Sequence, residues 1–462
     1  MINLQNIYDK SPIFFQNIMT SVKGYTNSKD RYGKRYYEYR KFLKDFDTWP
    51  LEQKYEYQRT ELIKFIRFAY QNNDFYHQLY KGIDISSIQT VKDLQKLPIV
   101  DKEMLRANIL SVTSRNCGPT HEEHTGGTTG KSLSFQVTRN DSMERMAMLD
   151  HFKSRVGYEH LQMKRATFNG KHIVPPNQKS KIFWRYNKAC KQMIFSSFHI
   201  TEENLKYYVE EFNRFKPEAI DGFFTSMLDL AGYIKRHKIS LTFQPIAIFP
   251  TSETLTKEGR ELLEEVFCCK VYDQYASSEG APFVTECRSQ VLHMELASGV
   301  FEHLPGSDEI LVTSFTTHAT PLIRYRIGDR MVFDEDTRCN CGNNSPVVRS
   351  IEGRRLDFLY TAEGAKINAG NASNLLKYLP NVVIRSQFVQ ESKDTVTLLL
   401  EVDKRRFREE HISELRKEFA HKFGNQTKLV IQCVDHIPRE KSGKFRMIKD
   451  MGDEPVQNIG GG

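Results

Sequence analysis

The stretch His124-Thr125-Gly126-Gly127-Thr128-Thr129-Gly130-Lys131 carries the strongest local signal in the chain. Glycines let the backbone turn tightly and bring its N–H groups close to phosphate oxygens, while hydroxyl groups and a lysine add donors and positive charge. The spacing differs from that of a Walker loop, because Gly126 and Gly130 stand one residue too close together. Taken alone, the stretch allows two interpretations, a phosphate-binding loop and a glycine-rich surface turn.

Four further segments follow this loop and complete an ordered set. They are Tyr275-Ala276-Ser277-Ser278-Glu279, Pro321-Leu322-Ile323-Arg324-Tyr325-Arg326-Ile327-Gly328-Asp329, Gly353-Arg354-Arg355-Leu356-Asp357 and Pro438-Arg439-Glu440-Lys441-Ser442-Gly443-Lys444. Together with the glycine-rich loop they resemble the phosphate loop, the Tyr-Gly-x-Ser/Thr-Glu segment, the Arg-Tyr-x-x-Gly-Asp segment, the hinge and the C-terminal lysine loop of the adenylate-forming superfamily. Within it the chain looks most like the phenylacetate–CoA ligase branch, including its capsular-polysaccharide-type (CapK-like) members, over about residues 50 to 450.

The resemblance implies a two-step reaction. A carboxylic acid substrate is activated with ATP to an acyl-AMP with release of pyrophosphate, and the acyl group then passes to an acceptor. The acceptor would be coenzyme A, or an amine or hydroxyl compound such as a polysaccharide precursor. The alternative is a non-catalytic nucleotide-binding or assembly subunit that retains the fold, against which the intact Lys131, Glu279, Asp329 and Lys444 argue.

Adenylation brings two anions together, so cations must offset their charge. The resemblance gives catalytic roles to Lys444, Glu279 and Lys131, with Glu279 holding Mg²⁺. It gives Asp329 the ribose hydroxyls and Arg354 the phosphate or ribose oxygens. The other expected nucleotide-binding residues are Thr125, Gly126, Gly127, Thr128, Thr129, Gly130, Ser252, Glu253, Tyr275 and Ser278. Each role has a structural alternative. Glu279 would then be an exposed loop glutamate and Asp329 an aspartate that satisfies its own turn. Arg354 would form a surface ion pair, and Lys444 would be a solvated loop lysine.

The sequence departs from the family pattern at three places, of which the last bears on the second step. Leu356 replaces the first aspartate of the hinge, which leaves Asp357 as the expected pivot, and Ala276 replaces a glycine. The segment from Leu359 to Lys366 differs from the one that usually assists the second half-reaction. The acceptor therefore stays open between coenzyme A and an amine or hydroxyl.

A cysteine and histidine cluster predicts a metal site. Of the eight cysteines, Cys287, Cys339 and Cys341 combine with His293 into a donor set typical of structural, tetrahedral Zn²⁺. In a cytosolic chain such clustering favours a metal over disulfides. Reduced cysteines beside a surface histidine are the alternative, and His293 is the least certain ligand.

Alternating helical and strand-like patterns predict an α/β fold. We expect a large N-terminal domain, residues 1–353, with helix-covered mixed sheets and a β-rich subdomain, which binds ATP and the acid. A small, mobile α+β domain, residues 354–462, would carry the catalytic lysine. The patterns place helices over 52–80, 256–267 and 406–423, and strands over 246–249 and 428–433. Thr256 and Asp101 are the expected N-caps.

Composition bounds the remaining possibilities. The 462 residues carry a net charge of +8, which suits a phosphate-bearing substrate or an acidic carrier more than nucleic acid. The basic, tyrosine-rich stretch 23–44 is interpreted as a solvated helix face rather than a nucleic-acid arm. The first residues show no secretory signal and no run of about 18 apolar residues occurs. We therefore expect a cytoplasmic protein without membrane insertion and without a nucleic-acid partner.

Overall fold

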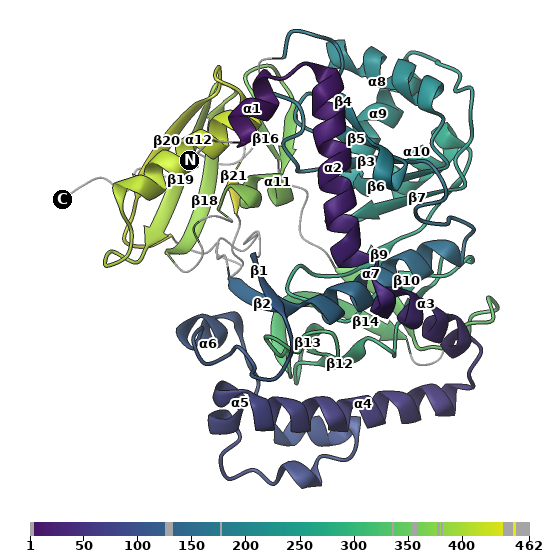
Figure 1. Cartoon of the computed structure of the whole chain (residues 1–462), viewed down its shortest axis with the longest axis vertical. Helices are drawn as coiled ribbons and strands as arrows, with labels where there is room; N and C mark the ends of the chain where they lie inside the picture. Colours follow the sequence, from purple (N-terminus) through teal and green to yellow (C-terminus); the bar gives the residue numbers. More distant parts are fainter. Residues whose placement is uncertain are drawn as a thin grey trace.

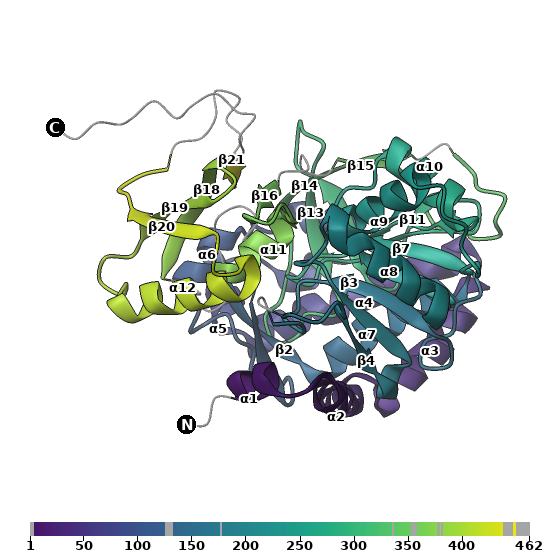
Figure 2. The same cartoon turned by 90° about the horizontal axis from the view of Figure 1, so that it is seen from above.

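Three larger sheets organise the chain (Figures 1 and 2). The computed structural model describes residues 4–124, 133–175, 178–334, 337–352, 358–376, 379, 382–437 and 447–449. The architecture is α/β, as the sequence predicted: a helix-covered sheet and an antiparallel sheet are followed by a C-terminal part that combines strands and helices. Within the described residues, no helix is both long and apolar enough to cross a membrane.

The first large sheet is mainly parallel. Its strands follow the order β4 (Trp184–Asn187), β5 (Gln192–Ser196), β3 (Arg165–Asn169), β6 (Ala219–Phe223), β7 (Ala247–Thr251) and β8 (Lys270–Val271), and β4 alone runs antiparallel to its neighbour. Helices α8 (Glu202–Phe215), α9 (Phe224–Arg236) and α10 (Lys257–Phe267) bury apolar side chains against it. Parallel strands point their carboxyl ends to one edge, where ligands of such sheets bind.

Two predictions for this sheet differ in outcome. The helix over 256–267 is confirmed, and the Thr256 side chain accepts a hydrogen bond from the Gly259 N–H as its N-cap. The strand predicted over 246–249 spans Ala247–Thr251, since Pro250 stays within it and pairs with Gly222 of β6. A proline ends a strand only where its missing N–H is needed for pairing, so the predicted C-terminal end of the strand was wrong.

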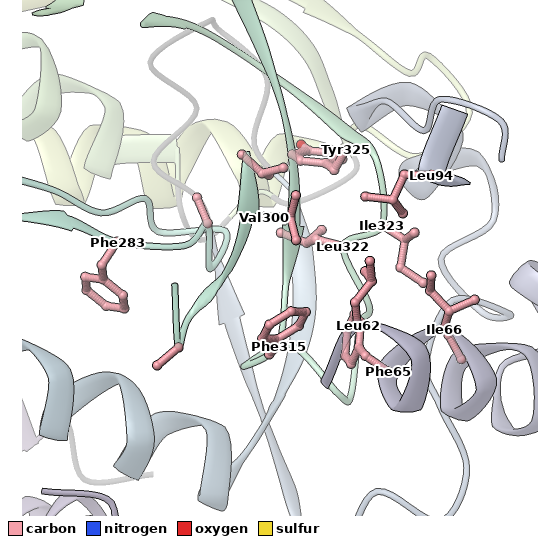
Figure 3. Packing of buried hydrophobic residues seen from close by; sticks show 14 of the residues in the cluster. Leu62, Phe65, Ile66, Leu94, Phe283, Val300, Phe315, Leu322, Ile323 and Tyr325 are labelled. Atoms are coloured by element: carbon pink, nitrogen blue, oxygen red, sulfur yellow. The ribbon is translucent and has the colours of Figure 1, made fainter. Parts of the chain in front are cut away.

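The second large sheet is antiparallel. Its order is β12 (Gly299–His303), β13 (Glu309–Ser314), β14 (Tyr325–Asp334), β15 (Val347–Glu352), β11 (Leu292–Met294), β10 (Val284–Glu286) and β9 (Gln274–Tyr275). Helix α4 (Leu51–Asn72) packs along it, and Figure 3 shows Leu62, Phe65 and Ile66 facing Phe315 and Leu322. This core joins segments far apart in sequence.

The helix predicted over 52–80 is two helices. Helix α4 ends at Asn72 and α5 spans Asp74–Leu79, because Asn73 adopts an extended conformation and its side chain accepts a hydrogen bond from the Tyr76 N–H. The Asn73 amide also donates to the Val112 carbonyl at 2.7 Å. Asparagine prefers such capping positions to helix interiors, so the apolar periodicity alone missed the break.

The C-terminal part has a core of its own residues, joined by Phe198 of the N-terminal part. Strands β20 (Lys428–Cys433), β19 (Thr395–Val402), β18 (Val383–Ser392) and β21 (Ile448–Lys449) form a sheet covered by α12 (Glu409–Phe423). A hairpin, β16 (Phe358–Tyr360) and β17 (Lys366–Asn368), precedes α11 (Ala369–Ser373) and η4 (Asn374–Leu376). The predicted strand over 428–433 is confirmed, whereas the helix predicted from residue 406 begins at Glu409.

The remaining elements lie in the first 200 residues. They are α1 (Leu4–Lys10), α2 (Ile13–Arg31), α3 (Lys34–Asp47), η1 (Ile85–Ser87), η2 (Val91–Lys96), α6 (Lys102–Ala107), β1 (Thr120–His124), β2 (Ser134–Thr138), α7 (Arg139–Ser154) and η3 (Lys188–Cys190). Asp101 caps α6 as predicted, because its side chain accepts from the Met104 N–H.

We expect Leu62→Ala to destabilise the N-terminal core by about 2–5 kcal/mol, because it leaves a cavity where a fully buried side chain packed. Urea unfolding monitored by fluorescence measures the loss. The matched control is Leu110→Ala, since Leu110 is 97% exposed and should change stability by less than about 0.5 kcal/mol. Equal effects of the two substitutions would contradict the packing described for α4.

Candidate active site and metal cluster

Strand β14 fixes a distant segment beside the candidate site. Val100 forms a parallel bridge with Tyr325: its N–H donates to the Arg324 carbonyl at 3.1 Å, and its carbonyl accepts from the Arg326 N–H at 2.8 Å. The buried Arg324 guanidinium also donates to the Leu97 carbonyl at 2.7 Å. The segment that leads into α6 is therefore attached to the strand that carries Asp329.

A β-bulge presents Asp329. The pairing of β14 with β13 is shifted between Glu309 and Leu311, and Gly328 within the bulge has φ +87°. That backbone conformation favours glycine, and bulges often redirect a side chain beside an active site. The half-buried Asp329 carboxylate accepts a hydrogen bond of 2.9 Å from the Tyr275 hydroxyl. Two predicted nucleotide-binding residues from separate motifs are thus in direct contact.

The predicted magnesium ligand lies against a lysine that the motifs did not include. Glu279 Oε1 is 3.3 Å from Lys102 Nζ, and both side chains are largely buried. Lys102 is the first residue of α6, directly after the segment bonded to β14. An anionic carboxylate and a cationic amine therefore face each other at the same place, which suits binding of a phosphate together with a divalent cation.

Arg145 of α7 holds the loop that carries Glu279. Its guanidinium donates to the carbonyls of Gly280 and Ala281, each at 2.9 Å, and to that of Ser277 at 3.3 Å. It also stacks over the Phe283 ring at 4.5 Å. Burial lowers the pKa of Arg145 to about 10, so the group remains charged at neutral pH. Ser278 is exposed in the same loop.

The segment Ser252-Glu253 follows β7 at the carboxyl edge of the parallel sheet. The Glu253 carboxylate accepts hydrogen bonds from the N–H and the hydroxyl of Thr225, at 2.8 and 3.0 Å, near the N-terminus of α9. Carboxylates stabilise this end of a helix, so Glu253 has a structural task besides its predicted one. Ser252 is exposed with φ +68°. In β6, an added side-chain carbon at Gly222 would meet the Phe168 carbonyl oxygen at 1.8 Å, so only glycine fits there.

Several predicted residues lie outside the described residues. They are Thr125, Gly126, Gly127, Thr128, Thr129, Gly130, Lys131, Arg354, Asp357 and Lys444. The described neighbours of Lys444 are both bonded to β18: the Ile437 carbonyl accepts from Arg385 at 2.8 Å, and the Met447 carbonyl accepts from the Phe388 N–H at 2.7 Å.

The cysteine and histidine cluster forms where the antiparallel sheet brings two loops together. Cys287 follows β10 and His293 lies in β11, which pairs with β15, so that the loop from β14 to β15 places Cys339 and Cys341 beside them. One ligand atom from each residue lies within 4.8 Å of all the others. His293 and Cys339 are far apart in sequence, and the pairing of β11 with β15 brings them together.

The geometry fits a tetrahedral metal. Cys287 Sγ lies 3.7 Å from Cys339 Sγ, and Cys341 Sγ lies 3.7 Å from His293 Nε2. A tetrahedron with metal–sulfur bonds of about 2.3 Å has edges of about 3.8 Å. His293 Nδ1 is 2.9 Å from the Ser345 carbonyl, a hydrogen bond that leaves Nε2 for a metal. Burial raises the pKa of the Cys287 thiol, but hydrogen bonds from His293 and from backbone N–H groups outweigh it and lower that pKa to about 6.

Known proteins resemble the chain in both parts. Residues 359–451 match the family described as CapK C-terminal domain. Protein CapK of Staphylococcus aureus is 38% identical over 447 residues, which span 96% of this chain and 98% of that protein.

Solved structures share the fold. A 2-hydroxyisobutyryl-CoA ligase in the postadenylation state with R3-HIB-AMP has a TM-score of 0.55 at 16% identity, covering 87% of this chain and 91% of that one. The same ligase with 2-HIB-AMP and CoA in the thioesterification state has a TM-score of 0.54 at 18% identity, with the same coverages of 87% and 91%. The chain therefore belongs to the CapK family, and its fold is that of the adenylate-forming ligases.

Proposed function

We propose that this protein is an adenylate-forming ligase that activates a carboxylic acid with ATP and transfers the acyl group to an acceptor. The observation that carries the proposal is the contact of Tyr275 with Asp329, next to the loop in which Glu279 faces Lys102. A ribose-binding carboxylate and a phosphate- and metal-binding pair are what ATP requires. Family membership supports the same reaction class.

In this proposal the described residues bind ATP in parts. Asp329 accepts hydrogen bonds from the ribose hydroxyls, and Tyr275 holds that carboxylate in place. Glu279 would hold Mg²⁺, and the ion would neutralise phosphate charge as the carboxylate of the acid approaches. Lys102 then exchanges its contact with Glu279 for a phosphate oxygen. The glycine-rich loop 125–131 is proposed to surround the remaining phosphates.

The acid is proposed to bind between Gly222–Ser226 and Tyr275–Ser278. The two segments belong to different sheets. Gln274 Nε2 of β9 donates to the Pro250 carbonyl of β7 at 3.4 Å, and this hydrogen bond links the two sheets. Phe223 and Phe224 are buried, as is the Thr225 side chain next to them. An apolar wall with few hydroxyl groups suits an organic acid and excludes water from the acyl phosphate.

For the second step we propose that residues 354–462 rotate about Asp357. This rotation would carry Lys444 out of the site and make room for the acceptor. Apart from Phe198, the core of this part consists of its own residues, which supports such a movement. Among the described residues, its polar contacts with the rest include Arg106 with the Val383 carbonyl at 2.9 Å and Lys366 with Asp229 at 3.1 Å. The acceptor is coenzyme A or an amine or hydroxyl compound. The ligase of similar fold was solved with both 2-HIB-AMP and CoA.

Lys444→Ala should reduce acid-dependent ATP–pyrophosphate exchange by ~10²–10³, because the lysine acts where charge builds in the transition state. The acid is first chosen from a panel of carboxylic acids with the wild-type protein. Lys404→Ala is the matched control, since Lys404 is an exposed lysine of the same part, paired with Asp435. Pyrophosphate exchange at the wild-type rate in Lys444→Ala would refute the catalytic role of Lys444. ATP binding without exchange for any acid would favour an assembly subunit.

Asp329→Ala should weaken the thermal stabilisation that ATP with Mg²⁺ confers, because the ribose loses its acceptor. Tyr275→Phe should weaken it less, since it removes only the hydrogen bond that orients the carboxylate. Melting curves at increasing ATP concentration measure both. Equal ATP responses of Asp329→Ala and wild type would refute the ribose role.

We further propose that Cys287, His293, Cys339 and Cys341 hold one structural Zn²⁺. Protein side chains would fill all four coordination positions of the ion, so no position would remain for a water molecule or a substrate. The ion would tie the loop between β14 and β15 to the strand β11, and thereby stabilise the sheet that carries Tyr275 and Asp329.

Freshly purified protein should contain about one zinc ion per chain. Cys339→Ser should lose the ion and lower the melting temperature, because a thiolate ligand is removed. Cys433→Ser is the matched control, because Cys433 is exposed and lies outside the cluster. Mass-spectrometric metal analysis decides: absence of zinc from unchelated wild-type protein would eliminate the site.

A further inference from the structure

The outer face of α2 carries a concentration of exposed apolar side chains. Eleven large apolar residues are exposed in the described part of the chain, and six of them belong to α1 and α2. They are Ile7, Phe14, Phe15, Ile18, Val22 and Tyr25. Phe14, Ile18, Val22 and Tyr25 recur every three or four residues and so form one stripe, with Phe14 70% and Val22 58% exposed. We call all six exposed residues, with Ile7 and Phe15 included, the α2 stripe.

Helix α2 cannot turn this stripe inward, because its opposite face is fixed to the parallel sheet. Gln16 accepts from the buried Arg185 at 2.6 Å, and Ser21 accepts from the Lys188 N–H at 3.0 Å. Gly24 lies so close to Asn187 that an added side-chain carbon would be 2.2 Å from its oxygen. The helix is therefore a rigid ridge on the outside of the molecule, as both views show (Figures 1 and 2).

The stripe is surrounded by positive charge. Lys10, Lys23, Lys29, Arg31 and Lys188 are exposed on or beside the two helices. Among the described residues, none of these five forms an ion pair with an acidic side chain. Both aspartates of α1 and α2 are engaged: Asp9 lies 3.5 Å from His172, and Asp30 lies 2.5 Å from Arg139. An apolar stripe flanked by unpaired basic groups requires an apolar and anionic counterpart.

A second copy of the chain does not meet this requirement. Two α2 helices facing each other would bring basic groups onto basic groups, with no unpaired acidic residue of α1 or α2 to offset them. The stripe lies on a single helix at the outside of the molecule (Figures 1 and 2). A helix with aromatic and aliphatic residues on one face and lysines beside them is typical of binding in the plane of a membrane interface.

We propose that α2 docks this protein on the surface of an anionic lipid bilayer. The α2 stripe enters the boundary between headgroups and acyl chains, and the five basic residues contact lipid phosphates. Lys29 lies over the Tyr25 ring at 4.5 Å, which places an amine at headgroup level beside an interfacial tyrosine. The contact is peripheral and compatible with the absence of spanning helices among the described residues.

The full chain should sediment with vesicles of phosphatidylcholine containing about 30% phosphatidylglycerol, but not with phosphatidylcholine alone. Phe14→Asp and Val22→Asp should each lower the partition coefficient at least about tenfold. Lys23→Gln combined with Lys29→Gln should lower it about 25-fold, at about fivefold per lysine. Melting temperatures should stay close to wild type, because these side chains are exposed.

Leu110→Asp is the matched control, a still more exposed apolar residue outside the stripe, and it should bind vesicles like wild type. No sedimentation of wild-type protein with anionic vesicles would overturn the proposal. So would binding that Phe14→Asp and Leu110→Asp alter alike. Light scattering that shows a dimer in wild type and a monomer in Val22→Asp would also overturn it, because the stripe would then be an interface between copies. None of these readouts depends on the proposed ligase activity.

Discussion

Pairing of β14 on both sides is the constraint on which the rest of the structure depends. One edge of the strand bonds β13, and the other edge bonds Val100 at the start of the strand and β15 farther along. Its first half presents Asp329 through a bulge, and its end leads into the loop that contains Cys339 and Cys341. A single strand therefore sets the position of the candidate ribose site, of the Lys102–Glu279 pair and of half of the metal cluster. A shift of register in β14 would displace all three.

The motifs and the local patterns of the sequence were sufficient for much of this arrangement. They predicted the α/β class, the capping of α6 and α10, and the grouping of Cys287, His293, Cys339 and Cys341, which the sheet brings together. Signals of this kind are local: a turn, a cap or a donor set consists of a few neighbouring residues. Where one residue decided against the periodicity, as Asn73 does between α4 and α5, the local pattern failed.

Long-range contacts were beyond such reasoning. Arg145 holds the Glu279 loop from 135 residues away in sequence, and Lys102 reaches Glu279 across 177 residues. Neither residue was among the predicted site residues, and an arginine in an amphipathic helix predicts only a solvated face. Both became visible because the second sheet packs against α7 and joins the segment 97–102. The roles of all the site residues stay predictions from the motifs, and Lys131, Arg354, Asp357 and Lys444 also lie outside the described residues.

The core between α4 and the antiparallel sheet also has a consequence for folding during synthesis on the ribosome. Helix α4 buries Phe65 against Phe315, and Leu62 and Ile66 pack in the same cluster with strands β12 to β14. These partners are 250 residues apart in sequence, and a ribosome needs about 12–50 s to add that many residues. During this time the nascent helices expose a large apolar surface with nothing to cover it. Newly emerging chains should consequently require a chaperone, and truncations before β14 should aggregate rather than fold.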